Sequence, residues 1–321
     1  MVEVQVRILN GEDYRDLVEI VNLVEAPWQT CEEELHKEDS EVSEAGGTVY
    51  HYVAVEGEQG RVIGHGVLRG REGRHILQQY SLELRIHPDW ERHGAGALLW
   101  QRLQEDLKML QPTSVRVWVR ERYPQALGFA GRRDFVEISR SGPWVLSVAE
   151  ADLNPFLPAL ERCASSGITL TTLTEERERA PHCLSALHRL RIAIDADIPA
   201  AEPYPIVSLE DFAREVENAW ADGFFIAKRG DDYIGLSCLS HSPVDPQELH
   251  QSVTGVRGDY RNHGIATALK VRGIQLAQAR GCAKIVTYVD STNIPMTALN
   301  RKLGFSGGND AVLMERQYRT A

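Results

Sequence analysis

Two stretches of this 321-residue chain repeat one pattern of residues 170 positions apart, and this duplication limits the possible folds more than any other feature. The turn Gly94-Ala95-Gly96 returns as Gly264-Ile265-Ala266. The flanking pairs at the same spacing are Trp90 and Tyr260, His93 and His263, Leu99 and Leu269, Val119 and Val289, and Phe135 and Phe305. Chance does not keep one register over about forty residues, so we infer an internal repeat.

The length of the chain suits two domains of about 150 residues, each large enough to bury its own core. We place the first domain at residues 1–152, a linker helix at 153–167 and the second domain at 168–321. In both halves, short β-rich runs alternate with amphipathic helical stretches in the same order. The sequence therefore predicts two α/β domains, each with a mixed sheet flanked by helices.

Composition argues against several classes of protein. The net charge of −11 disfavours nucleic acid as a general partner. No apolar run approaches the roughly 20 residues that span a membrane, and residues 1–12 lack the pattern of a signal peptide. We therefore expect a cytoplasmic protein without a membrane partner. The five cysteines are scattered without a Cys-x-x-Cys pair, which favours reduced thiols and gives no basis for a metal site.

A phosphate-binding turn is the strongest chemical signal in the chain. A β-rich run ending at Val256 leads through a turn of basic and small residues into a helix predicted at 262–280. Gly264 and Ala266 remove side-chain bulk where backbone N–H groups at a helix N-terminus face an anion such as a pyrophosphate. Arg261 adds a positive charge beside them. Taken alone, these small residues are better explained by close packing of the helix on a sheet.

Two other phosphate-binding folds fit this turn poorly. A P-loop requires a Gly-Lys-Ser/Thr sequence, which is absent. A Rossmann dinucleotide site requires a third glycine and an acidic residue after the following strand, and neither stands at the expected place.

A second motif follows the turn, and the two together resemble the GNAT superfamily of acyl-CoA-dependent N-acyltransferases. The family signature Arg/Gln-x-x-Gly-x-Gly/Ala is followed by a strand, an asparagine and a Gly-Phe ending. The matching positions are Arg261, Gly264, Ala266, the strand residues 287–289, Asn293, Gly304 and Phe305. Residues 254–256, together with Met296 and Asn300, further resemble the C-terminal half of tandem GNAT proteins, the group that includes mycothiol synthase.

The resemblance implies a fold and a cosubstrate. Each domain would hold a mixed, mostly antiparallel sheet, splayed between the strand ending at Val256 and the strand beginning at Lys284. Acetyl-CoA would lie in that split, with its pantetheine on residues 254–256 and its pyrophosphate on residues 261–267. The implied cofactor-binding residues are Thr254, Gly255, Val256, Arg261, Asn262, His263, Gly264, Ile265, Ala266, Thr267, Asn293 and Asn300.

The resemblance also implies where a general base stands. Histone-acetylating members carry a glutamate eleven residues before the signature Arg/Gln, and this chain has His250 at that position. An imidazole is a suitable base near neutral pH. Glu248, two residues earlier on the same strand face, is the alternative, and a solvated strand residue is the other interpretation of His250. Many members place a tyrosine as general acid where this chain has Asn300, so we assign no general acid.

The first repeat departs from the family pattern. Its substitutions are Glu91 at the position of Arg261, Asp134 at that of Gly304 and Tyr123 at that of Asn293. Gly94 and Gly96 persist, so residual cofactor binding stays open. We predict that the first domain is mainly structural or shapes the substrate site, and that the second domain carries the activity.

These observations predict an acetyl-CoA-dependent N-acetyltransferase acting on a primary amine of a small molecule, as a monomer or a homodimer. One alternative is a non-catalytic acyl-CoA-binding or scaffold protein, which Asn300 and the altered first repeat favour. Another is a mycothiol-synthase-like acetyltransferase. The cofactor motif says little about the acceptor, because function depends on the substrate site.

Overall fold

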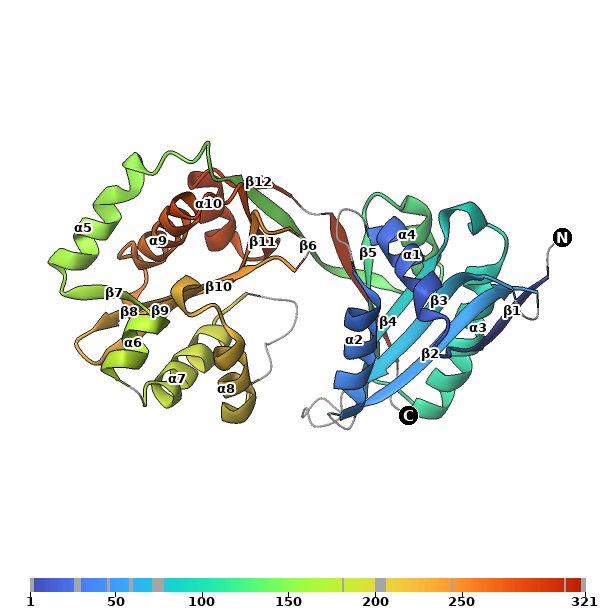
Figure 1. Ribbon diagram of the computed structural model, residues 1–321. Helices are drawn as coiled ribbons and strands as arrows, with labels where there is room; N and C mark the ends of the chain where they lie inside the picture. The colour runs from blue at the N-terminus through green and yellow to red at the C-terminus, as the bar shows by residue number, and fades with distance from the viewer. Residues whose placement is uncertain are drawn as a thin grey trace. The chain divides into compact units, whose positions relative to one another are not determined.

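The chain forms two compact units, each of mixed α/β structure (Figure 1). Unit 1 comprises residues 1–138 and 312–321, and unit 2 comprises residues 139–311. The computed structural model describes residues 3–25, 30–44, 47–57, 60–70, 78–180, 182–199, 206–243, 245–308 and 310–318. In both units the sheet is open and mixed, as the sequence predicts.

Unit 1 contains a sheet in the order β1-β2-β3-β4-β5-β13. Its strands are β1 (Val4–Ile8), β2 (Thr48–Glu56), β3 (Val62–Gly70), β4 (Gln79–Ile86), β5 (Ser114–Arg120) and β13 (Ala311–Gln317), with the start of β6 (Val136–Ser147). Its helices are α1 (Tyr14–Glu25), α2 (Glu32–Glu44), the short η1 (Pro88–Trp90), α3 (Ala95–Leu110) and α4 (Pro124–Gly131). Strands β1 to β4 are antiparallel neighbours, and β5 joins β4 in parallel.

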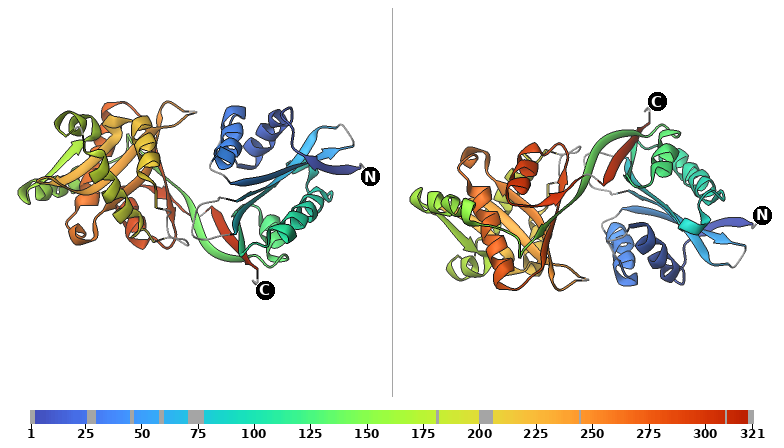
Figure 2. Two further views of the ribbon diagram at one scale, coloured as in Figure 1. Left: turned by 90° about the horizontal axis from the view of Figure 1, so that it is seen from below. Right: turned by 90° about the horizontal axis from the view of Figure 1, so that it is seen from above.

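Alternation along β2 explains how the sheet of unit 1 buries both of its faces, because successive strand side chains point to opposite sides. Tyr52 and Ala54 belong to the core formed with Leu99 and Leu103 of α3. Val53, between them, belongs to the core formed with α1. Figure 2 shows the teal α3 on one face of these strands and the blue α1 and α2 on the other.

Unit 2 contains a sheet in the order β6-β11-β10-β9-β8-β7, with β12 beside β6. Its strands, besides β6, are β7 (Ile168–Thr172), β8 (Phe224–Arg229), β9 (Asp232–His241), β10 (Glu248–Val256), β11 (Lys284–Asp290) and β12 (Ser306–Gly307). Its helices are η2 (Asn154–Phe156), α5 (Leu157–Ser165), α6 (Leu173–Arg179), α7 (Leu184–Asp195), α8 (Leu209–Asn218), η3 (Ala221–Gly223), η4 (Gly258–Tyr260), α9 (Ile265–Ala279) and α10 (Ile294–Lys302). The pair β10 and β11 is parallel, and its flanking pairs are antiparallel.

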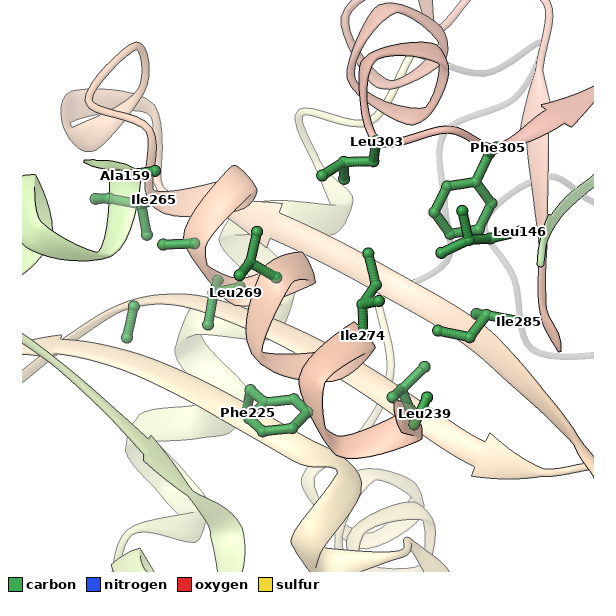
Figure 3. Close-up of a cluster of buried hydrophobic side chains, with 14 of the residues drawn as sticks. Leu146, Ala159, Phe225, Leu239, Ile265, Leu269, Ile274, Ile285, Leu303 and Phe305 are labelled. Carbon is green, nitrogen blue, oxygen red and sulfur yellow. The ribbon is translucent and has the colours of Figure 1, made fainter. Parts of the chain in front are cut away.

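Helix α9 covers one face of the unit 2 sheet and forms the core drawn in Figure 3. Leu269 and Ile274 of α9 lie in the same cluster as Phe225 of β8 and Leu239 of β9. Ile226, the next residue of β8, belongs instead to the cluster formed with α7 and α8. Unit 2 therefore repeats the two-sided burial of unit 1.

The two compact units divide the chain differently from the boundaries that we place on the sequence. The segment 153–167, predicted as a linker, contains α5, which lies inside unit 2 with Ala159 in its core. Residues 139–147 of β6 also lie in unit 2, where they pair with β11. Val312 of β13 lies in the core of unit 1. The last strand of each repeat thus joins the unit of the other repeat, a choice of partner that strand patterning cannot reveal.

Within the described ranges, no helix combines the length and the apolar character that crossing a membrane requires. All five cysteines are free thiols, of which Cys163 and Cys183 are buried.

Candidate functional site

The sheet of unit 2 splits between β10 and β11. These strands pair in parallel from Glu248 with Lys284 as far as Gln251 with Thr287. Beyond that point β10 continues beside β9 alone, while β11 stays paired with β6 as far as Asp290. The sheet is therefore splayed between β10 and β11, as the resemblance predicts.

A β-bulge marks the point where β10 leaves β11. The register of β10 against β9 shifts between Gln251 and Thr254. An extra residue in one strand leaves backbone groups unpaired and bends the strand. Gly255 follows the bulge, and a Cβ there would stand 2.1 Å from Cγ2 of Ile194 on α7. The missing side chain at Gly255 therefore lets α7 pack against the strand.

The N-terminus of α9 presents unpaired backbone donors. Gly264 is the N-cap residue, with φ of 81° in the left-handed region that favours glycine, and no side chain caps the helix. Within the described chain, the first intrahelical bond at this end runs from the N–H of Ala268 to the carbonyl of Gly264 at 2.9 Å. The N–H groups of residues 265–267 are thus available to an anion, and the helix dipole favours negative charge there.

The guanidinium of Arg261, expected from the sequence beside an anion, has two partners in the structure. Its Nε donates to the carbonyl of Val256 at 3.1 Å, and its Nη2 lies 2.7 Å from the Oδ2 of Asp197. The guanidinium therefore ties the end of β10 to the segment after α7, and Asp197 offsets its charge. His263 Nδ1 lies 2.7 Å from the carbonyl of Arg261 and holds the same turn.

Arg162 of α5 lies beside this turn, and the sequence analysis did not single it out. A Cβ on Gly264 would stand 3.4 Å from its Nη2 and 3.6 Å from the Cβ of Ala159. Figure 3 shows Ala159 next to Ile265 at the start of α9. Among the described residues, no acidic side chain forms an ion pair with Arg162. No motif signals this arginine, because it precedes the glycine turn by about a hundred residues and reaches it only through the packing of α5 on α9.

The two candidate bases contact one another on β10. His250 Nε2 lies 2.5 Å from Glu248 Oε1, and Lys284 Nζ lies 2.7 Å from Glu248 Oε2. Burial by itself raises the pKa of Glu248, but the hydrogen bonds and charges of Lys284 and His250 outweigh burial and lower it below its ordinary value. Glu248 is therefore a carboxylate near neutral pH, with both oxygens engaged, and His250 is the more exposed member of the pair.

The two asparagines of the second motif have different surroundings. Asn293 is the N-cap of α10, and its Oδ1 accepts a hydrogen bond from the N–H of Met296 at 3.2 Å. Asn300 is fully buried, and its Nδ2 and Oδ1 have no partner among the described residues. A buried amide without partners is rare and requires an explanation.

The same turn in unit 1 is altered at the positions predicted from the sequence. Gly94 keeps the left-handed conformation with φ of 92° at the start of α3. Glu91 precedes it and accepts from Gln125 Nε2 at 3.2 Å, so a carboxylate stands near the helix N-terminus. Asp134 adopts φ of 63°, a strained value for a residue other than glycine. Tyr123 begins α4 without a side-chain cap.

Groups of histidine, cysteine and carboxylate side chains suited to a metal ion are absent from the part of the chain that the structure describes.

Comparison with known proteins identifies the family. The profile of the acetyltransferase (GNAT) family matches residues 12–135 and again residues 191–305. The chain belongs to the acetyltransferase (GNAT) family. The two matches make it a tandem GNAT protein and confirm the internal repeat. Members of this family use acetyl-CoA, and we therefore describe the protein as an N-acetyltransferase.

Relatives and solved structures agree with this assignment. Mycothiol acetyltransferase of Saccharomonospora viridis is 27% identical over 264 residues, which cover 78% of each chain. The enzyme of the same name from Acidothermus cellulolyticus is 26% identical over 82% of this chain and 78% of its own. A tandem GNAT protein from the clavulanic acid biosynthesis pathway is similar in fold, with a TM-score of 0.72 at 18% identity over 99% of this chain and 100% of its own. A GCN5-related N-acetyltransferase from Sphaerobacter thermophilus has a TM-score of 0.70 at 16% identity, over 98% of this chain and 95% of its own.

Proposed function

We propose that unit 2 of this acetyltransferase binds acetyl-CoA and transfers its acetyl group to a primary amine of a small molecule. The observation that carries the proposal is the split between β10 and β11, which opens beside the uncapped N-terminus of α9. A pantetheine chain needs backbone partners of this kind, and a pyrophosphate needs orphan N–H donors. Unit 1 lacks part of this arrangement, and we propose a mainly structural or substrate-shaping role for it.

The residues of unit 2 suit acetyl-CoA along its length. Residues 254–256 would pair with the pantetheine, and residues 264–267 would receive the pyrophosphate, with Arg162 supplying the positive charge. Asn300 is fully buried on α10 and would support the site through the packing of that helix rather than by contact with acetyl-CoA. Arg261 would act by holding the turn, because its guanidinium is engaged with Asp197. Asn262, His263 and Asn293 would shape the site through the turn and the cap of α10.

The pair Glu248 and His250 suits removal of the amine proton. With His250 Nε2 held 2.5 Å from the Glu248 carboxylate, the imidazole would accept the amine proton directly or through one water. The carboxylate would then stabilise the imidazolium. Glu248 is less suited to be the base itself, since Lys284 and His250 engage both of its oxygens. We assign no general acid, because an asparagine amide cannot give up a proton, and solvent would protonate the departing thiolate.

Calorimetric titration with acetyl-CoA, followed by thiol release across a panel of amines, tests the proposal. We expect one site per chain and turnover with at least one amine. Failure to bind at hundreds of micromolar would refute the proposal, whereas binding without turnover on any amine would favour an acyl-CoA-binding scaffold.

A second candidate function is acetylation of a mycothiol precursor. The names of the curated relatives favour it, at 26–27% identity over most of both chains. Including the acceptor amine of mycothiol acetyltransferase in the panel separates it from the general proposal, because a preference for that amine would identify the acceptor.

A further inference from the structure

A lysine is buried inside the apolar core of unit 2. Lys270 lies on α9 between Leu269 and Val271 and is 2% exposed. Its Nζ stands 5.0 Å from the ring centroid of Phe305. Charged groups are almost never fully buried without a partner, because leaving water is costly for them. The hydrogen-bond partners of Lys270 therefore need to be identified.

Lys270 begins a chain of side-chain hydrogen bonds that ends at Thr254 of β10. Its Nζ donates to Oε1 of Gln251. Gln251 Nε2 donates to Ser237 Oγ at 2.9 Å, and Ser237 Oγ lies 2.9 Å from Thr254 Oγ1. Gln251 and Thr254 are the two residues that flank the bulge in β10. The chain therefore crosses the bulge and joins its two sides.

The same residues stand where β10 separates from β11. Gln251 and Thr287 form the last pair of the parallel ladder. Thr287 Oγ1 donates to the carbonyl of Gln251 at 2.9 Å and adds a side-chain bond at that point. Lys270, Gln251 and Thr287 thus connect α9, β10 and β11 at the closed end of the split.

Unit 1 offers a natural comparison, because it has the same strands without the polar chain. Strand β4 pairs with β3 from Tyr80 to Ile86 without a shift in register. The pairing partners show which positions correspond: Leu82 to Gln251, Gly66 to Ser237, Leu84 to Thr254, Val117 to Thr287 and, on the helix, Trp100 to Lys270. The ring centroids of Trp100 and Phe135 lie 5.8 Å apart, and Lys270 contacts Phe305 at the corresponding place in unit 2. The fold therefore accepts an apolar residue here, and the bulge and the polar chain occur together in unit 2.

We propose that Lys270 is a positioning residue for acyl transfer, which holds the bulge of β10 through Gln251 and Ser237 and thereby orients Thr254 and the backbone after it toward acetyl-CoA. The proposal rests on the proposed function in one respect, that the backbone after Thr254 contacts acetyl-CoA. The hydrogen bonds that hold the bulge are independent of it. A bulge can relax into regular pairing unless its two sides are held, and the polar chain supplies that restraint.

Binding of acetyl-CoA to four variants tests the proposal. Lys270→Met removes the donor and keeps the length of the side chain, and Thr254→Val removes the hydroxyl at the other end. We expect each to weaken binding about tenfold, equivalent to about 1.4 kcal/mol, and the double variant to be no weaker than either alone. Ile274→Val on the same helix is the control, since it removes core volume without touching the chain, and should leave the dissociation constant unchanged. A stability defect alone would lower the fraction of competent protein rather than the affinity of the folded fraction.

Hydrogen exchange separates this proposal from the proposed function. In Lys270→Met the amides of residues 251–256 should exchange faster than in the wild type, with the α9 amides as internal reference. Unchanged exchange, unchanged affinity or additive effects in the double variant would overturn the role of Lys270. If the wild type does not bind acetyl-CoA but residues 251–256 still exchange faster in Lys270→Met, the restraint on the bulge stands and the proposed function is refuted instead.

Discussion

Replacing Lys270 with methionine should change how the stability of unit 2 depends on pH. Burial lowers the pKa of Lys270 from 10.5 to about 7 in the folded protein, and unfolding restores the ordinary value. Between these two values the unfolded chain holds a proton that the folded chain has lost. The stability of the wild type therefore rises with pH across this window, whereas methionine contributes no such dependence.

The size of the effect follows from the pKa shift. Each pKa unit corresponds to about 1.4 kcal/mol, so a fall from 10.5 to about 7 penalises the folded state by about 5 kcal/mol. The penalty is fully present below about pH 7 and disappears above about pH 10.5. Between about pH 7 and about pH 9, the free energy of unfolding of the variant relative to the wild type should fall by about 2 kcal/mol. The variant also loses the hydrogen bond to Gln251, which lowers its stability at both pH values.

Urea unfolding at the two pH values measures this difference. Circular dichroism gives the transition, and exchange of the α9 amides shows which step belongs to unit 2, because a two-unit chain need not unfold in one step. Lys302→Met is the matched control, since Lys302 is exposed near the end of α10 and should show no such change. Parallel pH dependences for Lys270→Met and the wild type would refute the reasoning.

Four substitutions test the assignment of the site, and one deletion tests the division into units. Gly264→Val should weaken acetyl-CoA binding at least about tenfold, because it strains the left-handed turn and crowds the N–H donors. Gly94→Val should leave binding intact. Calorimetry measures both, and the reverse result would contradict the choice of unit 2. Arg162→Met should raise the dissociation constant about tenfold and reduce its dependence on salt, and an unchanged salt dependence would speak against a phosphate contact. His250→Ala should lower turnover about 10²-fold with acetyl-CoA affinity nearly unchanged, and full turnover would remove His250 as base. Deleting residues 312–321 should destabilise unit 1 by several kcal/mol, because Val312 lies in its core, and exchange protection that fell only in unit 2 would contradict the division into units.

The sequence by itself determines the repeat, the α/β class and the place of the glycine turn before α9. These features are local or periodic, so spacing alone is enough to predict them. Gly264 is required by the left-handed turn at the start of a helix, and alternation along the strands predicts which side chains reach the core. His250 and Glu248 share a strand face because a strand has a period of two, and this places them in contact before any tertiary contact is known.

Only the tertiary structure shows which distant segments the residues of the site contact. Arg261 matches the signature, but only the approach of Asp197 shows that its charge is already offset. Arg162 reaches the turn only because α5 packs on α9, and Lys270 becomes a positioning candidate only because Gln251 meets it across the core. The terminal strands β6 and β13 pair outside their own repeats. A residue's pattern along the chain predicts which face it lies on, whereas its partner depends on which distant segment packs there, and that is settled only when the whole core forms.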